Sequence, residues 1–236
     1  MHSNTILITG GGTGIGRGLA EAFHGLGNQV IITGRTEATL KETCDANPGM
    51  RHYVLDCTDA SAIRHGAEQL NVVMNNAGVQ IGHDFGSDIQ PDWNLIDAEI
   101  STNLLGVIRT SLAFLPHLKK QDGATVINVT SGLAYVPLFR TPIYCATKAA
   151  VHSFTMSLRM QLAGSGVNVV ELAPPRVGTN LGGGRNLPFS MPVLVFVEEA
   201  MKGLQAGTDE VGVGMAKDLM AIAGTEGVKQ RMTQFK

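Results

Sequence analysis

Three side chains between Ser131 and Lys148 could carry out acid–base chemistry on a carbonyl group. Tyr144 and Lys148 are four residues apart in a stretch predicted to be helical from Pro142 onward, so both should project from one face. An ammonium beside a phenol favours the phenolate and should lower the tyrosine pKa from about 10. Ser131 follows an apolar run at 124–129 that is typical of a buried strand. A hydroxyl there could share a carbonyl oxygen with the tyrosine, which indicates a ketone or alcohol site.

A tyrosine and a lysine four residues apart form a weak pattern that many helices contain by chance. Support comes from a glycine-rich stretch, TGGGTGIG at residues 9–16, which follows a predicted strand and opens a predicted helix. Glycine lets the backbone approach a pyrophosphate, and a helix N-terminus offers N–H donors and a positive dipole. The alternative is a glycine-rich turn without a ligand. The strand–turn–helix context favours a nucleotide site.

Composition argues against several classes of protein. The 236 residues include 18 Lys and Arg and 20 Asp and Glu, so the net charge is −2, and we expect no nucleic acid or membrane partner. The longest apolar run, 191–197, contains a proline and is too short to span a bilayer. The chain enters a strand almost at once, so we expect no signal peptide. Three cysteines without a CxxC pair fit a reducing cytoplasm, and the seven histidines show no metal-binding spacing, so we expect no metal.

Strand-like and helix-like segments alternate along the chain. The strands are apolar throughout, which is typical of a parallel sheet covered by helices on both faces. Without a linker or repeat, the sequence predicts one α/β domain over residues 1–236, a doubly wound Rossmann fold of about seven strands. The predicted strands are 5–9, 29–33, 51–55, 71–74, 124–129, 167–172 and 210–213. The predicted helices are 15–26, 36–46, 59–70, 93–113, 142–164, 197–204 and 216–222.

Polar residues follow several of these strands, where ligands bind in such sheets. Arg35 follows the second strand, where no acid lies within 30–36 to hold a ribose diol, and an arginine can accommodate a 2′-phosphate. Asp56, after the third strand, could accept a hydrogen bond from an adenine amino group. The alternatives are a solvated surface charge for Arg35 and a helix cap shared with Thr58 for Asp56. Asn103, in mid-helix, marks either a functional kink or a polar face.

From residue 5 almost to its C-terminus, the chain resembles the short-chain dehydrogenase/reductase family, in its NADP-preferring main branch. Several motifs in the right order carry this resemblance. They are the cofactor motif Thr9-Gly10-x-x-x-Gly14-Ile15-Gly16, the Asn75-Asn76-Ala77-Gly78 motif after the fourth strand, the catalytic tetrad Asn103, Ser131, Tyr144 and Lys148, and the segment Pro174-x-x-Val177-x-Thr179, which resembles the one that holds the nicotinamide carboxamide.

The resemblance implies a role for each member of the tetrad. Tyr144 donates or accepts the proton, and Ser131 positions the carbonyl oxygen. Lys148 lowers the tyrosine pKa and bonds the nicotinamide ribose, while Asn103 holds a water that relays protons to solvent. The implied cofactor is NADP(H), which supplies the hydride chemistry. Besides Tyr144 and Lys148, the expected cofactor-binding residues are Gly10, Gly12, Thr13, Gly14, Ile15, Gly16, Arg35, Asp56, Cys57, Asn76, Ala77, Gly78, Pro174, Val177 and Thr179.

Two features depart from the family pattern. Only fourteen residues, 57–70, separate the third and fourth strands, so the adenine edge of the site could differ, although about a dozen suffice for a crossover. Pro175 stands where the family usually has glycine. Because proline fixes φ and lacks an N–H, the loop before Thr179 should be stiffer or follow another path.

The sequence therefore predicts an NADPH-dependent reductase of a ketone or aldehyde, working reversibly with the alcohol. The substrate should be small and hydrophobic, because the residues after Ser131 are mostly apolar. One alternative is a non-catalytic NADP(H)-binding regulator or sensor on the same fold. Another is an NAD-dependent dehydrogenase, which the missing acid after the second strand disfavours. The family implies a homodimer or homotetramer through the two long helices, where Val107, Leu158 and Leu162 face either the partner or the sheet.

Overall fold

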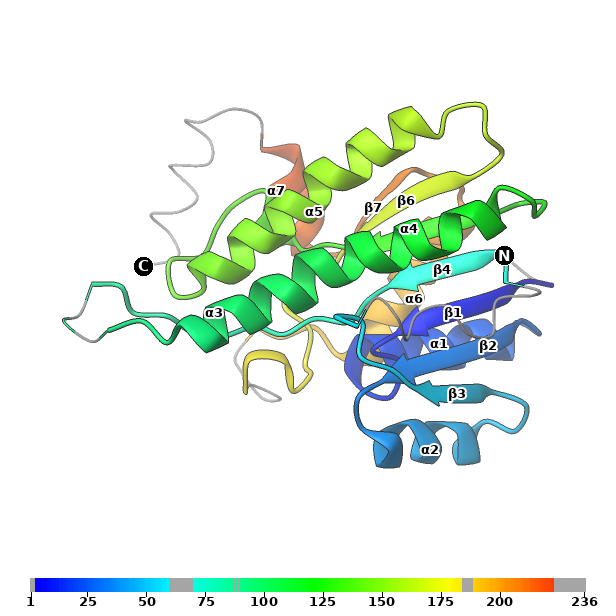
Figure 1. Cartoon of the computed structure of the whole chain (residues 1–236), viewed down its shortest axis with the longest axis horizontal. Coiled ribbons are helices and arrows are strands. Elements are labelled where there is room, and N and C mark those ends of the chain that lie inside the picture. Colours follow the sequence, from blue (N-terminus) through cyan, green and yellow to red (C-terminus); the bar gives the residue numbers. More distant parts are fainter. Residues whose placement is uncertain (1–2, 60–69, 87, 89, 184–188, 223–236) are drawn as a thin grey trace.

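The computed structural model describes residues 3–59, 70–86, 88, 90–183 and 189–222, and its seven strands form a single parallel sheet (Figure 1). The order across the sheet is β3-β2-β1-β4-β5-β6-β7. This order confirms the predicted doubly wound fold, and every predicted strand is present within one residue at each end. The strands are β1 (Thr5–Thr9), β2 (Gln29–Gly34), β3 (Arg51–Val54), β4 (Val72–Asn75), β5 (Thr125–Val129), β6 (Asn168–Ala173) and β7 (Glu210–Gly212).

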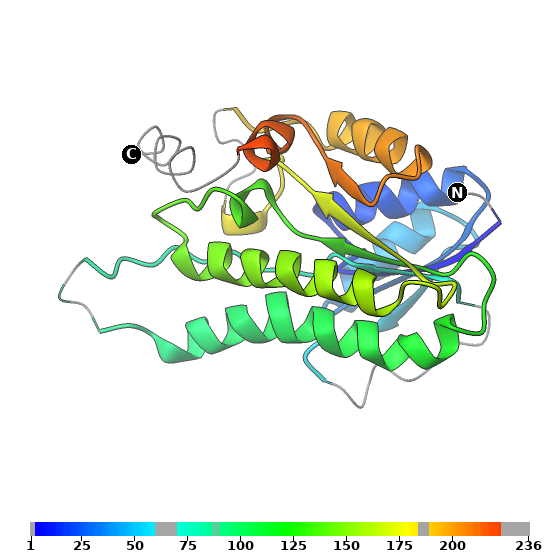
Figure 2. The same ribbon diagram turned by 90° about the horizontal axis from the view of Figure 1, so that it is seen from above.

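Helices cover both faces of the sheet (Figure 2). One face carries α1 (Gly14–Gly25), α2 (Glu37–Ala46) and α6 (Val193–Gln205), and the other carries α3 (Trp93–Ile100), α4 (Gly106–Leu118) and α5 (Pro142–Gln161). Within β1, Ile6 and Ile8 point into the first layer and Leu7 into the second. Successive side chains of a strand face opposite sides, so burial on both faces explains the unbroken apolar strands.

The predicted long helix at 93–113 is interrupted. Between α3 and α4 the backbone forms a π-helical turn, η2 (Ser101–Leu105), and Asn103 lies within it with no exposed surface. The backbone is therefore irregular at Asn103, and because π-turns within helices frequently mark functional sites, its functional role stays a prediction. The helix predicted at 59–70 lies largely outside the described residues.

Burial shows which apolar residues of α4 and α5 face inward. Val107, Leu158 and Leu162 are each at most 4% exposed, and both leucines belong to the core against the sheet. The two leucines therefore face the sheet, and all three side chains are buried within the chain and not on an outer face. The outward apolar residues of this layer are Leu105, Leu112, Met156 and Met160. No helix in the described part of the chain is long and apolar enough to cross a membrane.

Short helical segments complete the structure at the carboxyl edge of the sheet. Residues Gly132–Ala134 form the 3-10 turn η3 directly after Ser131, and α7 (Met215–Ala221) packs against it. Leu181–Gly183 form a second short turn, η4. The turns after β1, β4, β5 and β6 therefore meet at one edge, as the parallel topology requires.

Candidate active site

Ser131, Tyr144 and Lys148 come together at the carboxyl end of β5. Ser131 lies two residues after that strand, and its Oγ accepts a hydrogen bond of 3.1 Å from the N–H of Leu133. The Ser131 hydroxyl lies close enough to Tyr144 to lower the pKa of its phenol. Lys148, one turn further along α5, has its Nζ 5.8 Å from the centre of the Tyr144 ring. The predicted one-sided arrangement of the pair on a helix is therefore present.

Burial controls the ionisation of this cluster. Tyr144 is 6% exposed, and burial raises the pKa of its phenol above the usual 10, although the Ser131 hydroxyl lowers it. In the protein alone, desolvation of the phenol is the largest influence on this pKa, and the expected lowering by Lys148 stays a prediction. Burial also lowers the pKa of Lys148 itself, from 10.5 to about 8. The tyrosine is consequently protonated at neutral pH.

Asn103 connects the tetrad to the loop after β4. Its Oδ1 accepts from the N–H of Val79 at 2.8 Å, and its Nδ2 donates to the Val79 carbonyl at 2.8 Å and to Thr147 Oγ1 at 3.2 Å. A Cβ placed on Gly78 would lie 3.3 Å from Asn103 Oδ1 and 3.8 Å from Lys148 Nζ. The loop therefore passes close to both side chains, and all four tetrad residues belong to one cluster.

The glycine-rich turn is built for close packing and for an anion. Gly10 has φ +67°, which favours glycine, and a Cβ on Gly16 would lie 2.2 Å from the Gly10 carbonyl oxygen. Thr13 is exposed at the N-cap of α1, its side chain makes no capping bond, and no acidic residue lies in the first turn. The N–H groups and positive end of α1 are thus available to a phosphate group, so the turn fits a dinucleotide.

The loop after β4 is fixed beside this turn. Thr9 Oγ1 accepts from the N–H groups of Asn76 and Ala77, each at 3.0 Å. The Asn76 amide donates to the carbonyl oxygens of Thr9 at 2.9 Å and Gly10 at 3.3 Å. The structure therefore joins the first two cofactor motifs. Thr9 belonged to the quoted motif but not to the predicted site, and its position at the carboxyl end of a strand was the signal that could have found it.

Arg35 lies directly after the end of β2. It is exposed, and it forms no ion pair with any described residue. The nearby basic side chain of Arg17 is instead occupied by Glu21 at 2.8 Å and Glu42 at 2.7 Å. A Cβ on Gly12 would lie 2.9 Å from Thr39 of α2, so the helix that follows Arg35 packs closely on the glycine turn.

The side chains of Asp56 and Cys57, both expected to bind the cofactor, make different contacts. Asp56 Oδ1 accepts from the N–H of Thr58 at 2.9 Å and from its Oγ1 at 2.8 Å. This pairing with Thr58 is the local bonding expected if Asp56 serves as a cap and not as an adenine contact. Cys57 is buried against Gly106, and burial raises its thiol pKa to about 11. The thiol is therefore turned toward α4, so a contact with cofactor would involve the Cys57 backbone.

The segment after β6 returns to the glycine turn despite Pro175. A Cβ on Gly14 would lie 3.1 Å from Thr179 Cγ2. The path is fixed by pairing with Met191, because Gly178 N donates to the Met191 carbonyl and Met191 N to the Arg176 carbonyl, both at 2.9 Å. The proline therefore does not divert Thr179 from the glycine turn. Pro174 and Val177 are buried beside it.

Two buried carboxylates near the tetrad were not predicted. Glu99, one turn before Asn103, accepts from the Ile81 N–H at 3.0 Å and pairs with His83 at 3.2 Å. Glu171, in β6, accepts from three side chains. Both are 0% exposed. For Glu171, a single acid within an apolar strand was the available signal, but its partners are distant in sequence.

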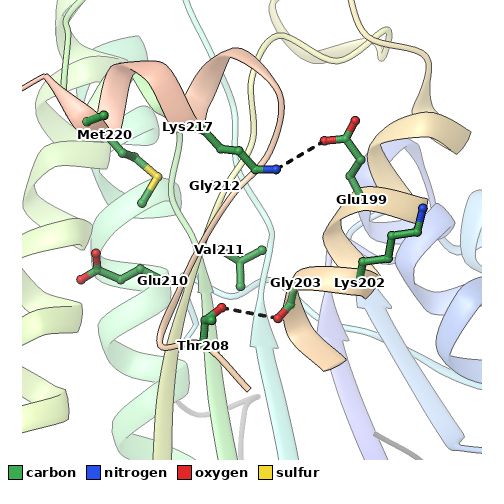
Figure 3. Close-up of a pocket in the computed structure, with 10 residues that line it drawn as sticks. Glu199, Lys202, Gly203, Thr208, Glu210, Val211, Gly212, Lys217 and Met220 are labelled. Carbon is green, nitrogen blue, oxygen red and sulfur yellow. Dashed lines mark hydrogen bonds and ion pairs between the residues drawn. The ribbon is translucent and has the colours of Figure 1, made fainter. Parts of the chain in front are cut away.

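A second hollow lies away from the tetrad, between α6, β7 and α7 (Figure 3). Lys217 faces Glu199 across it at 4.0 Å, and Thr208 Oγ1 donates to the Gly203 carbonyl at 3.4 Å. None of the turns after β1, β4, β5 and β6 contributes to its lining. The described residues also contain no group of three or more His, Cys, Asp or Glu that could hold a metal ion.

Comparison with known proteins agrees with this geometry. The family model for short chain dehydrogenase matches residues 4–187. The chain is 45% identical to the uncharacterized oxidoreductase DltE of Bacillus subtilis (strain 168) over 189 residues, which are 77% of this chain and 74% of DltE. It is 33% identical to sulfoacetaldehyde reductase 2 of Chromohalobacter salexigens over 184 residues, 73% of this chain and 72% of that protein.

A solved structure extends the match to the whole fold. The crystal structure of a short chain dehydrogenase from Burkholderia cenocepacia J2315 in complex with NADP is 28% identical, with a TM-score of 0.84. The match covers 98% of this chain and 99% of that one. The chain therefore belongs to the short-chain dehydrogenase/reductase family, whose members matched here carry oxidoreductase names.

Proposed function

We propose that this chain is an NADPH-dependent reductase of ketones or aldehydes. The observation that carries the proposal is the buried Tyr144 phenol, which lies beside Ser131 and is flanked by Lys148. A protonated phenol can give a proton to a carbonyl oxygen, so this arrangement is suited to carbonyl reduction.

Each residue of the site has a separate role in the proposed reduction. NADPH, when bound, supplies a hydride to the carbonyl carbon. Tyr144 donates its proton to the carbonyl oxygen, and the Ser131 hydroxyl holds that oxygen in place. Lys148 and Asn103 orient the cofactor ribose and the loop after β4, and they connect the tyrosine to a source of a new proton. The product is the corresponding alcohol.

Cofactor choice follows from Arg35. Its guanidinium is exposed and unpaired among the described residues, at the position where a 2′-phosphate is bound in dinucleotide folds. The Burkholderia cenocepacia relative was solved with NADP, which supports the same choice here. The glycine turn and α1 would hold the pyrophosphate, and the segment from Pro174 to Thr179 would hold the nicotinamide.

The substrate we propose is small and hydrophobic. Leu133, Ala134 and Leu138 are half-buried around the turn after Ser131 and would bound the pocket. Tyr135 and Val136, in the same stretch, are engaged elsewhere, because the Tyr135 hydroxyl is hydrogen bonded to Glu171 and Val136 is 0% exposed. A relative at 33% identity is named a sulfoacetaldehyde reductase, which supports aldehyde reduction as the reaction type.

We also propose that the chain is a single domain over residues 1–236 that works in the cytoplasm as a homodimer or homotetramer. The outer faces of α4 and α5 expose Leu112 (51%) and Met160 (80%), which suit contact with a second copy. The alternative function, a non-catalytic NADP(H) sensor, would use the same glycine turn and Arg35 without turnover.

The test compares NADPH and NADH binding by protein fluorescence and then measures NADPH consumption with small and bulky ketones and aldehydes. Preferred binding of NADPH with turnover of a carbonyl compound is the expected result. Tight NADPH binding with no consumption across the panel would instead favour the sensor. Preferred binding of NADH would contradict the assignment of Arg35.

A further inference from the structure

The carboxylate of Glu171 joins four elements that surround the catalytic residues. Its Oε1 accepts from Thr130 Oγ1 at 2.6 Å and from the Tyr135 hydroxyl at 2.9 Å, and its Oε2 lies 2.7 Å from His152 Nδ1. Thr130 follows β5, Tyr135 ends η3, His152 belongs to α5, and Glu171 belongs to β6. One buried acid is therefore bonded to every element that carries a member of the Ser-Tyr-Lys group.

Two of its partners bracket the catalytic serine. Thr130 precedes Ser131, and Tyr135 follows the turn that Ser131 begins. The backbone adds two contacts on the same side, because Thr130 N donates to the Leu172 carbonyl at 2.8 Å and Gly132 N to the Pro174 carbonyl at 2.9 Å. The turn that orients the Ser131 hydroxyl is thus held at both ends against the end of β6.

The third partner reaches the helix of the other catalytic residues. His152 lies four residues after Lys148 and eight after Tyr144 on α5, so the three project near one face. Its ring packs against the Tyr135 ring with centroids 4.6 Å apart. An ionised carboxylate can only accept hydrogen bonds, so His152 Nδ1 carries the proton directed at Glu171.

Such a network is costly if it serves stability alone. A buried carboxylate loses its hydration, and apolar side chains of similar volume often stabilise a protein equally well. Here the acid is 0% exposed and meets three donors, and burial further raises the pKa of Tyr135, which keeps its O–H available as a donor. Hydrogen bonds are directional, so this network fixes the orientation of the side chains that it joins, which an apolar cluster would not do.

We propose that Glu171 is a positioning residue. It acts through Thr130, Tyr135 and His152 to hold the Ser131 hydroxyl in a fixed position relative to Tyr144 and Lys148. It touches neither substrate nor cofactor in this role. The inference rests on the proposed reductase function for its kinetic consequence, while the fixed geometry of the turn can be measured without activity.

The test uses three network variants and one matched control. Glu171→Gln keeps an oxygen for Thr130 and Tyr135, and its amide can face His152 in the other tautomer. Glu171→Met keeps similar length but removes every acceptor, and Tyr135→Phe removes one donor. The control is Thr155→Val. Thr155 lies on α5, like His152, and the change removes the buried 2.9 Å hydrogen bond that Thr155 accepts from Asn128, without touching the turn after Ser131.

The expected kinetic result separates positioning from stability. Glu171→Met should lower kcat on the order of 10- to 100-fold, as expected for a displaced catalytic group, with NADPH Kd within about threefold. Tyr135→Phe should show a smaller loss of kcat, and Glu171→Gln and Thr155→Val should stay within about threefold of wild type. Unchanged kcat in both Glu171→Met and Tyr135→Phe, whatever their melting temperatures, would overturn the proposal.

Hydrogen exchange on the NADPH-bound protein gives a readout that does not need turnover. The amides of residues 130–136 should exchange faster in Tyr135→Phe and Glu171→Met, but not in Thr155→Val. If the wild type reduces no carbonyl compound, the proposed function fails while this measurement still decides the inference. Unchanged exchange in the turn of both variants would contradict it.

Discussion

Lys148 Nζ donates a hydrogen bond of 2.8 Å to the carbonyl oxygen of Val129. Val129 is the last residue of β5, two before Ser131, and Lys148 is one turn after Tyr144 on α5. This contact ties the helix that carries the tyrosine to the strand that carries the serine. The lysine therefore has a structural position in the protein alone, in addition to the ribose contact proposed for it.

The buried ammonium of Lys148 should make stability depend on pH. Burial lowers its pKa from 10.5 to about 8, so below pH 8 the folded state holds an unfavourable charge. The difference corresponds to roughly 3 kcal/mol, which the bond to Val129 partly offsets. We expect Lys148→Met to be more stable than wild type by about 1–2 kcal/mol at pH 7, measured by urea denaturation without cofactor.

The size of that difference should change with pH. Between pH 8 and 10.5 the lysine becomes neutral first in the folded state, so the cost to wild type disappears as pH rises. The advantage of Lys148→Met should therefore shrink to zero or reverse at pH 10. An advantage that is constant from pH 7 to pH 10 would show that the lysine charge is not the cause.

The tyrosines should ionise unequally. Of the three, Tyr135 and Tyr144 are held protonated by burial, which raises both pKa values, whereas Tyr53 is 44% exposed. At about pH 11, above the pKa of an ordinary phenol, Tyr135 and Tyr144 should remain protonated, so folded Tyr53→Phe protein should show no tyrosinate by absorbance near 295 nm. Two tyrosinates in protein that circular dichroism shows to be folded would contradict the raised pKa of Tyr144.

Arg35→Asp should exchange the cofactor preference. Losing the guanidinium removes charge-assisted bonds to a 2′-phosphate, and the new carboxylate can hold a ribose diol. NADPH should bind roughly 10- to 100-fold more weakly and NADH more tightly, by fluorescence titration. Arg51→Asp is the matched control. Arg51 is also exposed, but it is the first residue of β3 and so lies at the amino ends of the strands, away from the carboxyl ends where Arg35 lies. Equal losses in both variants would show only a general charge effect.

Gly16→Ala should damage the cofactor turn. The added Cβ would lie 2.2 Å from a backbone oxygen of Gly10 and 2.4 Å from Asn76 Nδ2, so the turn or α1 must move. We expect a loss of about 1–3 kcal/mol in the free energy of unfolding and weaker NADPH binding. Gly25→Ala, on the same helix with nothing within 4 Å, should be neutral or stabilising. Wild-type NADPH affinity in Gly16→Ala would contradict the tight packing.

The sheet and the tetrad could be predicted because their signals are local. Strands buried on both faces are apolar at every position, as Ile6, Leu7 and Ile8 show. Parallel strands also bring their carboxyl ends to one edge, which places Ser131 near the glycine turn. The i, i+4 spacing of Tyr144 and Lys148 needs only a helix.

Other properties depend on contacts that spacing does not reveal. The direction of the Tyr144 pKa follows from burial in the assembled fold, which the spacing of Tyr144 and Lys148 does not reveal. Glu171 and Thr130 are 41 residues apart and meet only because β5 and β6 pair. The inward orientation of Leu158 likewise required the helix to be placed on the sheet.

The most direct measurement is a single turnover with NADPH deuterated at C4. Wild-type protein and Tyr144→Phe, both saturated with cofactor, are mixed with a carbonyl compound from the panel, and the alcohol is analysed for deuterium at its carbinol carbon. We predict rapid transfer in wild type and a rate about 10³-fold slower in Tyr144→Phe, with NADPH Kd nearly unchanged. Comparable transfer rates in the two proteins would contradict the role of Tyr144 as the proton donor.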